Sequence, residues 1–153
     1  MDKISELLEL NCISLDLQSK KRHEVIPELV EILASAGKID NRDFFVQELL
    51  EREKLSSTGI GNGIAIPHKL TSHISSTVLA LGKTTRGINF GSLDKKPVHL
   101  FFLILGPEGK HTEHLKLLSK LSRLLHDRQF CDQLFRAQSP SEVIALIKAK
   151  EEY

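Results

Sequence analysis

Three stretches near the N-terminus carry hydrophobic residues at helical spacing. Residues 1–10 predict a short first helix. A second helix follows Ser19, whose hydroxyl can cap it, and stops near Gly37. A third follows a cap at Asp40 and ends in the charged residues 51–54. The apolar positions of the second and third helices are Val25, Ile26, Leu29, Val30, Ile32, Leu33, Phe44, Phe45, Val46, Leu49 and Leu50.

The middle of the chain has the patterns of strands. Apolar and polar residues alternate over 13–17, which predicts a short strand. Residues 78–84 and 98–105 also predict strands, and the second run is apolar enough to lie in the centre of a sheet. A shorter apolar run, 64–66, is ended by Pro67.

The pattern becomes helical again after residues 106–109, where two glycines flank a proline and a glutamate. A short helix follows around 130–135, and a last one is capped by Ser139, with Pro140 at its first position. The stripe expected to face inward on the first of these helices is Leu115, Leu118, Leu121, Ser122 and Leu125, widened by Leu117 and Leu124. The inward positions of the last helix are Val143, Ile144 and Ile147.

Helices, then strands, then helices predict an α/β fold with a mixed sheet, whose strand order the pattern does not reveal. The chain has 153 residues, a length that suits one compact domain, so we expect residues 1–153 to form a single domain. Its 41% hydrophobic and 27% charged residues are typical of a globular protein and argue against disorder.

Charge and cysteine usage narrow the classes of partner and compartment. The formal net charge of +1 lacks the attraction that non-specific nucleic-acid binding requires, so no nucleic-acid partner is expected. Cys12 and Cys131 are far apart and suggest reduced thiols in a cytoplasmic protein. The acidic N-terminus does not resemble a secretory signal. The longest apolar run, 98–105, is too short for a membrane helix, which needs about 20 residues, so no direct membrane insertion is expected.

The most specific chemical signal is the segment 57–68, which holds three alternating glycines and ends in Pro67 and His68. Glycines let the backbone approach another group closely, and a proline restricts the local geometry. An unprotonated imidazole near neutral pH is a good nucleophile, and a histidine at the end of a strand suits attack on phosphorus. The alternative is an incidental surface histidine. The glycine spacing fits neither a dinucleotide-binding motif nor a P-loop.

A second candidate, His114, lies one turn before Leu118 at the start of the leucine-rich helix, so it should point towards the core. A neutral imidazole N–H in this first turn could donate to an anion such as a phosphoryl oxygen. Two alternatives stay open: a buried histidine satisfied by a carbonyl, or a metal site shared with His111. Zinc catalysis typically needs three protein ligands, and no such set is apparent.

Arg52 is the third candidate, because a guanidinium can hold phosphate oxygens by paired hydrogen bonds. Its position among the charges that end a helix is equally compatible with solvent exposure or with a pair to a neighbouring glutamate.

Three segments together resemble the EIIA component of the sugar phosphotransferase system, in its fructose–mannitol branch, which includes the nitrogen-regulatory EIIA proteins. They are Ser57–His68, with its GIAIPH ending, Gly87–Phe90 with Lys96–Ile104, and the helix His114–Leu125. The resemblance spans nearly the whole chain. It implies a mixed β-sheet flanked by helices on both faces, in agreement with the pattern of predicted elements.

The resemblance implies that His68 is phosphorylated by phosphohistidine of the carrier HPr, or of its nitrogen-branch counterpart, and passes the group to an EIIB domain. His114 matches the assisting histidine of the family, and Arg52 matches an arginine that lines the site. No cofactor or metal is implied. Lys69 stands where the family commonly has glycine, which affects the local loop geometry, and His111 has no clear equivalent.

Two roles follow within this family. One is a sugar-uptake relay, and the other is regulation of nitrogen or ion metabolism through the phosphorylation state. Since this sequence includes no EIIB, HPr or membrane segment, we slightly favour the regulatory role. The alternative from another class is a histidine-rich metal-binding protein or metal-dependent hydrolase.

Overall fold

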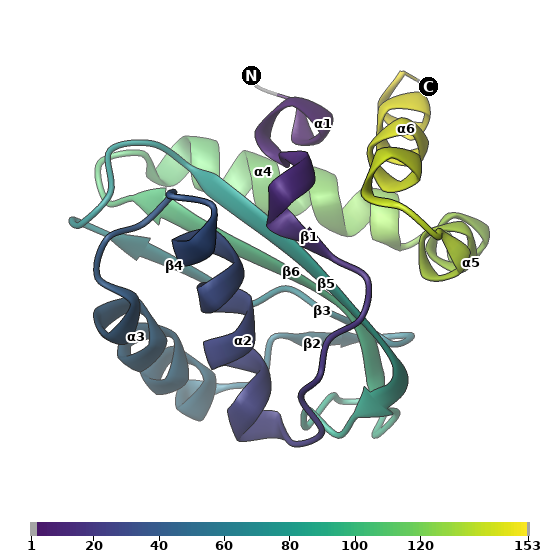
Figure 1. The fold of residues 1–153 in the computed structure, drawn as a ribbon, viewed down its shortest axis with the longest axis horizontal. Coiled ribbons are helices and arrows are strands. Elements are labelled where there is room, and N and C mark those ends of the chain that lie inside the picture. The colour runs from purple at the N-terminus through teal and green to yellow at the C-terminus, as the bar shows by residue number, and fades with distance from the viewer. Residues whose placement is uncertain (1–2, 153) are drawn as a thin grey trace.

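The computed structural model describes residues 3–152, which form a mixed β-sheet between two groups of helices (Figure 1). The helical elements are α1 (Ile4–Leu7), the 3₁₀ turn η1 (Leu10–Cys12), α2 (Arg22–Ser35), α3 (Arg42–Leu55), α4 (His111–Leu125), α5 (Arg128–Arg136) and α6 (Pro140–Glu151). The strands are β1 (Ile13–Ser14), β2 (Gly59–Gly61), β3 (Ile64–Ala65), β4 (His68–Thr71), β5 (Val78–Ile88) and β6 (Val98–Pro107). The predicted α/β class with a mixed sheet is confirmed.

Strand β6 is the centre of the sheet, as its continuous apolar run predicted. The strand order is β1-β5-β6-β3-β2, and β4 also pairs with β6. The long partner β5 is antiparallel to β6, whereas β3 and β4 are both parallel to it. Strands β3 and β4 therefore follow one another along the same edge of β6. This arrangement carries the chain directly to His68, the first residue of β4.

Consecutive residues of β5 show how the two faces of the sheet are covered. Gly82 faces Leu17, which precedes α2, and Leu29 of α2, and both side chains would lie within 3 Å of a Cβ atom at position 82. The next residue, Lys83, points to the other face, where its Nζ donates to the carbonyls of Phe135 (2.8 Å) and Ala137 (2.7 Å). Helices α2 and α3 lie on one face, and α4 to α6 on the other (Figure 1).

Lys83 of β5 is buried although it is charged, and the backbone carbonyls that its ammonium meets at the end of α5 explain why. Its ammonium satisfies carbonyls at the C-terminal end of α5, where cations are favourable. Burial lowers the pKa of this lysine. Buried cations need such partners, because removing a charge from water is costly. Lys83 thereby links β5 to the C-terminal end of α5.

Two predicted helix caps were wrong. Helix α2 begins after Lys21 rather than Ser19, because the Glu24 carboxylate accepts from the backbone amides of Lys20 and Lys21. Ser19 bonds instead to Glu28 of the same helix. For α3, the cap is Asn41 rather than Asp40, and its side chain accepts from Phe44 N at 3.2 Å.

Other boundaries agree with the sequence. Gly37 follows α2 with a φ of +74°, and the Ser139 hydroxyl caps α6 by accepting from Glu142 N at 3.1 Å. The alternating segment 13–17 forms a shorter strand than predicted: Ile13 and Ser14 pair in regular register with β5, and beyond them Leu17 N donates to Lys83 O of β5 at 2.8 Å.

The buried stripe of α4 differs from the predicted one at two positions. Leu115 is 64% exposed, and Ser122 is also exposed. The residues that face the core are His114, Leu117, Leu121 and Leu125. Leu117, Leu121 and Leu125 are buried as predicted, so the prediction is wrong only at Leu115 and Ser122. The first buried position is occupied by His114 instead of Leu115.

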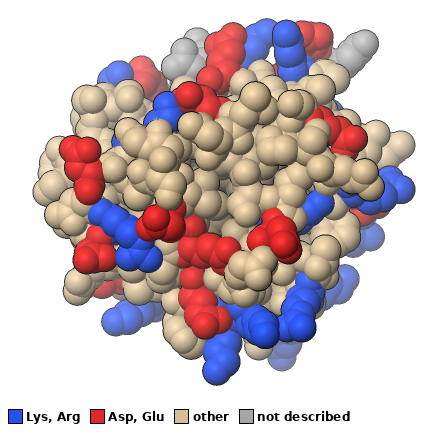
Figure 2. Space-filling view, viewed as in Figure 1, with Lys and Arg blue, Asp and Glu red and all other residues tan. Residues whose placement is uncertain are grey.

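The face that carries α2 and α3 mixes both signs of charge (Figure 2). An example is Arg42 of α3, whose Nε donates to Glu31 of α2 at 2.6 Å. Such exposed pairs contribute little to stability. The mixture agrees with the formal net charge of +1.

The packing of β5 against α2 predicts a clear stability difference between two glycine substitutions. Gly82→Ala should destabilise the fold by about 1–3 kcal/mol, because the new methyl group meets Leu17 and Leu29. Gly109→Ala is the matched control, since nothing lies within 4 Å of a Cβ atom there. Urea denaturation measures both. Equal stability of the two variants would contradict this packing.

Candidate functional site

His68 opens strand β4 instead of following the end of a strand, which corrects the sequence-based expectation. It is in register with Ile104 of β6. The preceding strand β3 ends at Ala65, and the ladder is interrupted at Ile66 and Pro67. The interruption occurs where the proline lacks an amide donor, while Pro67 O still accepts from Ile104 N at 2.9 Å. The histidine is therefore held on a rigid sheet.

The glycine-rich segment before His68 folds as a hairpin of β2 and β3. Gly61, Asn62 and Gly63 have positive φ angles of 91°, 57° and 82°, which form its turn. Gly59 permits a close approach, because a Cβ atom there would lie 2.1 Å from Ser92 Oγ. The sequence-based view that these glycines serve close backbone approach is confirmed at this position.

The two nitrogens of the His68 ring have different surroundings. Nδ1 lies 2.7 Å from the carbonyl oxygen of Ile66. A neutral imidazole that donates from Nδ1 carries its lone pair on Nε2. Burial lowers the pKa of His68, the bond to Ile66 partly opposes this, and the positive charge of Arg52 lowers it further, while Glu53 raises it. The ring is thus a neutral base with Nε2 available.

His114 packs beside His68 and is buried, as the helical spacing predicted. The two ring centroids are 5.7 Å apart. Gly106 of β6 makes room, because a Cβ atom there would lie 3.0 Å from His114 Nδ1. Within residues 3–152, neither ring nitrogen of His114 has a hydrogen-bond partner, so the carbonyl-satisfied alternative is wrong. Burial, followed by the charges of His68 and His111, lowers the pKa of His114 to about 4.

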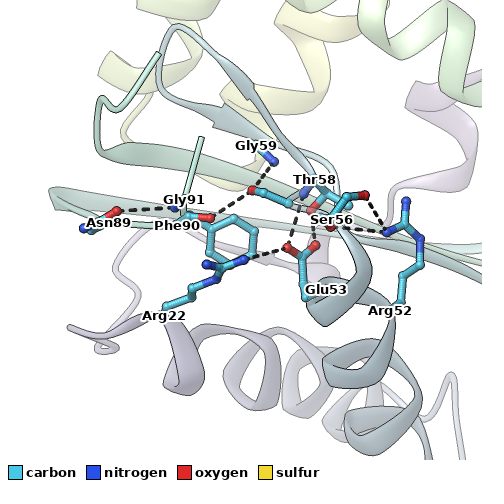
Figure 3. Close-up of polar contacts among 10 residues, drawn as sticks. Arg22, Arg52, Glu53, Ser56, Thr58, Gly59, Asn89, Phe90 and Gly91 are labelled. Atoms are coloured by element: carbon cyan, nitrogen blue, oxygen red, sulfur yellow. Dashed lines mark hydrogen bonds and ion pairs between the residues drawn. The ribbon is translucent and has the colours of Figure 1, made fainter. Parts of the chain in front are cut away.

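Arg52 and Glu53, on the last turn of α3, point in different directions (Figure 3). Arg52 Nη1 donates to the carbonyl (3.3 Å) and hydroxyl (3.4 Å) oxygens of Ser56. After burial, the positive charge of Arg52 also lowers the pKa of His68. The predicted alternative, a pair between Arg52 and a neighbouring glutamate, is not what forms: Glu53 pairs with Arg22 at 3.7 Å.

Glu53 is the residue of this region that sequence reasoning missed. Its carboxylate is buried and accepts from the backbone amide of Thr58 at 3.2 Å and from the Thr58 hydroxyl. The sequence places it in a run of charges that suggests solvent exposure. Its partner Arg22 lies 31 positions earlier, so no local signal indicates the pair.

The remaining candidates lie apart from this cluster or at its edge. His111 is exposed at the first residue of α4, and Lys69 is half-buried on β4. His99 has a structural role, since its Nδ1 lies 3.0 Å from Thr84 O and its ring packs on Phe135. Among the described residues no three His, Cys, Asp or Glu side chains gather as metal ligands, so the metal-dependent alternative lacks a donor set there.

In the part of the chain that the structure covers, no helix combines the length and the apolar character that crossing a membrane requires.

The low pKa of the buried His114 predicts a pH-dependent stability. Below the ordinary value of 6.5 the unfolded chain binds a proton that the folded chain resists down to about 4, so stability falls as pH falls through this window. From about pH 7.5 to about pH 5, the unfolding free energy should drop by about 2 kcal/mol through this residue. His68 shifts in the same direction.

Urea denaturation at the two pH values measures this loss. His114→Gln should lose most of the pH dependence, whereas the exposed His23→Gln should retain it. The same pH dependence in wild type and His114→Gln would contradict the assignment.

Comparison with known proteins identifies the family. The family model described as "Phosphoenolpyruvate-dependent sugar phosphotransferase system, EIIA 2" matches residues 6–150. A curated relative, the fructose-specific EIIABC component of the phosphotransferase system from Bacillus subtilis, is 42% identical over 145 residues. This alignment covers 95% of the chain but only 23% of that relative's length.

Two solved structures have the same fold. One is the nitrogen regulatory protein IIA-Ntr from Neisseria meningitidis, with a TM-score of 0.88 and 33% identity, covering 94% of this chain and 98% of that one. The other is the mannitol enzyme IIA of Escherichia coli in complex with phosphorylated mannitol enzyme IIB, with a TM-score of 0.78 and 25% identity, covering 94% and 99%. The chain belongs to the EIIA 2 family of the phosphoenolpyruvate-dependent sugar phosphotransferase system, a family that takes part in phosphoryl transfer.

Proposed function

We propose that this protein is a phosphocarrier that accepts a phosphoryl group on Nε2 of His68. The donor is a phosphohistidine of HPr or of its nitrogen-branch counterpart. One observation carries the proposal: a histidine with its lone pair on Nε2 lies beside a second, buried histidine whose ring nitrogens are both unpartnered within residues 3–152. Buried polar atoms are normally hydrogen-bonded, so the ring nitrogens of His114 support a role as donors to a group bound at His68.

The transfer is a displacement at phosphorus. The Nε2 lone pair of His68 forms the new N–P bond while the N–P bond to the donor imidazole breaks, and that electron pair returns to the donor nitrogen. The His68 ring gains positive character as the bond forms. The Ile66 carbonyl, 2.7 Å from Nδ1, stabilises this charge by accepting the N–H hydrogen bond. No metal enters the step, since the donor is already activated.

Arg52 and His114 provide stabilisation of the phosphoryl oxygens. Phosphoryl transfer depends mainly on positioning and on charge stabilisation at these oxygens. His114 is neutral near pH 7, because its pKa is about 4, and it can donate one N–H to an oxygen. An unsatisfied buried polar group destabilises the fold by about 1–3 kcal/mol. A hydrogen bond from His114 that forms only when the phosphoryl group is present offsets this penalty. The Arg52 guanidinium supplies full positive charge.

Two onward uses of the phosphoryl group fit this site. The mannitol complex supports transfer to an EIIB domain, because that structure joins enzyme IIA to phosphorylated enzyme IIB. The relative named as a nitrogen regulatory protein supports a regulatory role, which we propose is exerted through the phosphorylation state of His68. We extend both uses to this chain. The two uses share the same first step at His68.

His68→Ala should abolish phosphorylation by phosphoenolpyruvate, Enzyme I and HPr. The reason is that no other imidazole in the site has its lone pair oriented by a backbone carbonyl in this way. Mass spectrometry should locate an acid-labile phosphate on His68 of the wild type. His126→Ala, which alters an exposed histidine at the end of α4, should be labelled normally. Phosphate on another residue of the His68→Ala protein would exclude this assignment.

His114→Ala and Arg52→Ala should each slow transfer by about 10- to 100-fold, because each removes a donor to the phosphoryl oxygens. Rapid-quench measurement of transfer from phosphorylated HPr gives the rates. Arg123→Ala, an exposed basic residue near the far end of α4, serves as the control. Wild-type rates in both site variants would show that His68 acts without them.

A further inference from the structure

A continuous series of hydrogen bonds runs from Glu53 to the nucleophilic histidine. The Glu53 carboxylate accepts from Thr58 N at 3.2 Å. The Thr58 carbonyl accepts from Ile66 N at 3.0 Å. The Ile66 carbonyl in turn lies 2.7 Å from His68 Nδ1. The series joins the end of α3 to the start of β4 across the glycine hairpin.

Every member of this series before His68 is buried. Glu53 is 7% exposed, Thr58 6% and Ile66 2%. Hydrogen bonds shielded from water are strengthened, and neighbouring bonds polarise one another. The Thr58 hydroxyl adds a second bond to the same carboxylate. Such a network restrains the backbone around Ile66 much more strongly than exposed bonds would.

Arg22 provides the counter-charge at the other end (Figure 3). Its Nη2 lies 3.7 Å from Glu53 Oε2, and its guanidinium lies over the Phe90 ring, 5.4 Å from the centroid. A buried carboxylate requires this kind of compensation. The Glu53 carboxylate thus connects α2 and α3 with Thr58, which leads into the hairpin. Arg52 is the residue immediately before Glu53 in the sequence.

We propose that Glu53 is a positioning residue for phosphoryl transfer. Through Thr58 it fixes the Ile66 carbonyl that keeps the His68 lone pair on Nε2, and it anchors the helix end that carries Arg52. The carboxylate itself does not touch the phosphoryl group. This role rests on the proposed function of His68, but its effect on the imidazole exists before any phosphate arrives.

The first readout is the tautomer of His68 in the unphosphorylated, ¹⁵N-labelled protein, followed by NMR of the imidazole nitrogens near pH 8. The wild type should hold its proton on Nδ1. Glu53→Ala should increase the fraction with the proton on Nε2 several-fold. Glu53→Gln, which keeps an acceptor for Thr58, should give a smaller change. Glu51→Gln is the matched control, because Glu51 is an exposed glutamate on the same helical turn.

The second readout is transfer from phosphorylated HPr. Glu53→Ala should lower the rate at saturating donor about tenfold, the equivalent of one lost buried hydrogen bond, with an unchanged KM. Glu53→Gln should restore most of the rate. If Glu53→Ala does not fold, Glu53→Gln and Thr58→Val, which removes only the hydroxyl donor, test the same series with smaller expected changes.

An unaltered His68 tautomer in the folded Glu53 variants would overturn the proposal, as would a raised KM with an unchanged maximal rate. The two proposals fail separately. Absence of phosphate on wild-type His68 removes the phosphocarrier function, whereas the tautomer comparison tests the role of Glu53 without any phosphoryl donor.

Discussion

The hydrogen bond between His68 Nδ1 and the Ile66 carbonyl is the contact on which the proposed phosphoryl transfer depends. It decides which ring nitrogen carries the lone pair. Two backbone hydrogen bonds hold this carbonyl in place. The Ile66 amide donates to the Thr58 carbonyl, and the carbonyl of the next residue, Pro67, accepts from Ile104 N of β6. The sheet thereby sets the tautomer of a single side chain.

Strand β6 organises both halves of the site. Its edge receives β3 and β4, which deliver His68 from one side. Gly106, near its end, leaves space for His114 from α4. Residues separated by about 46 positions in the sequence thus meet at the same strand, their rings 5.7 Å apart. A central, largely buried strand is a rigid support, which suits a reaction that depends on positioning.

Electrostatics at the site favour an incoming anion. Burial keeps His114 neutral, and burial followed by the positive charge of Arg52 opposes protonation of His68. Both effects leave the pair of rings uncharged at neutral pH, so that one can attack and the other can donate. A phosphoryl group brings negative charge that the Arg52 guanidinium can stabilise. Glu53 sits close enough to act on His68, but its carboxylate is engaged by Thr58 and Arg22.

The sequence predicted the large elements because their patterns are local. The apolar run 98–105 indicated a central strand, and the spacing from His114 to Leu118 indicated an inward-facing histidine. Local pattern failed where polar residues are buried. His114 occupies the first core position of α4, where counting apolar residues alone placed the exposed Leu115.

The sequence by itself determined the α/β class, the motif that ends in His68, and the resemblance to a phosphotransferase family. Those features depend on residue type and short-range spacing. Only the tertiary structure decided that His68 begins a strand, that both nitrogens of His114 lack partners among the described residues, and that Glu53 turns to Arg22 and Thr58. Hydrogen-bond partners distant in sequence are chosen by packing, because a buried polar group bonds to whatever the fold brings within reach.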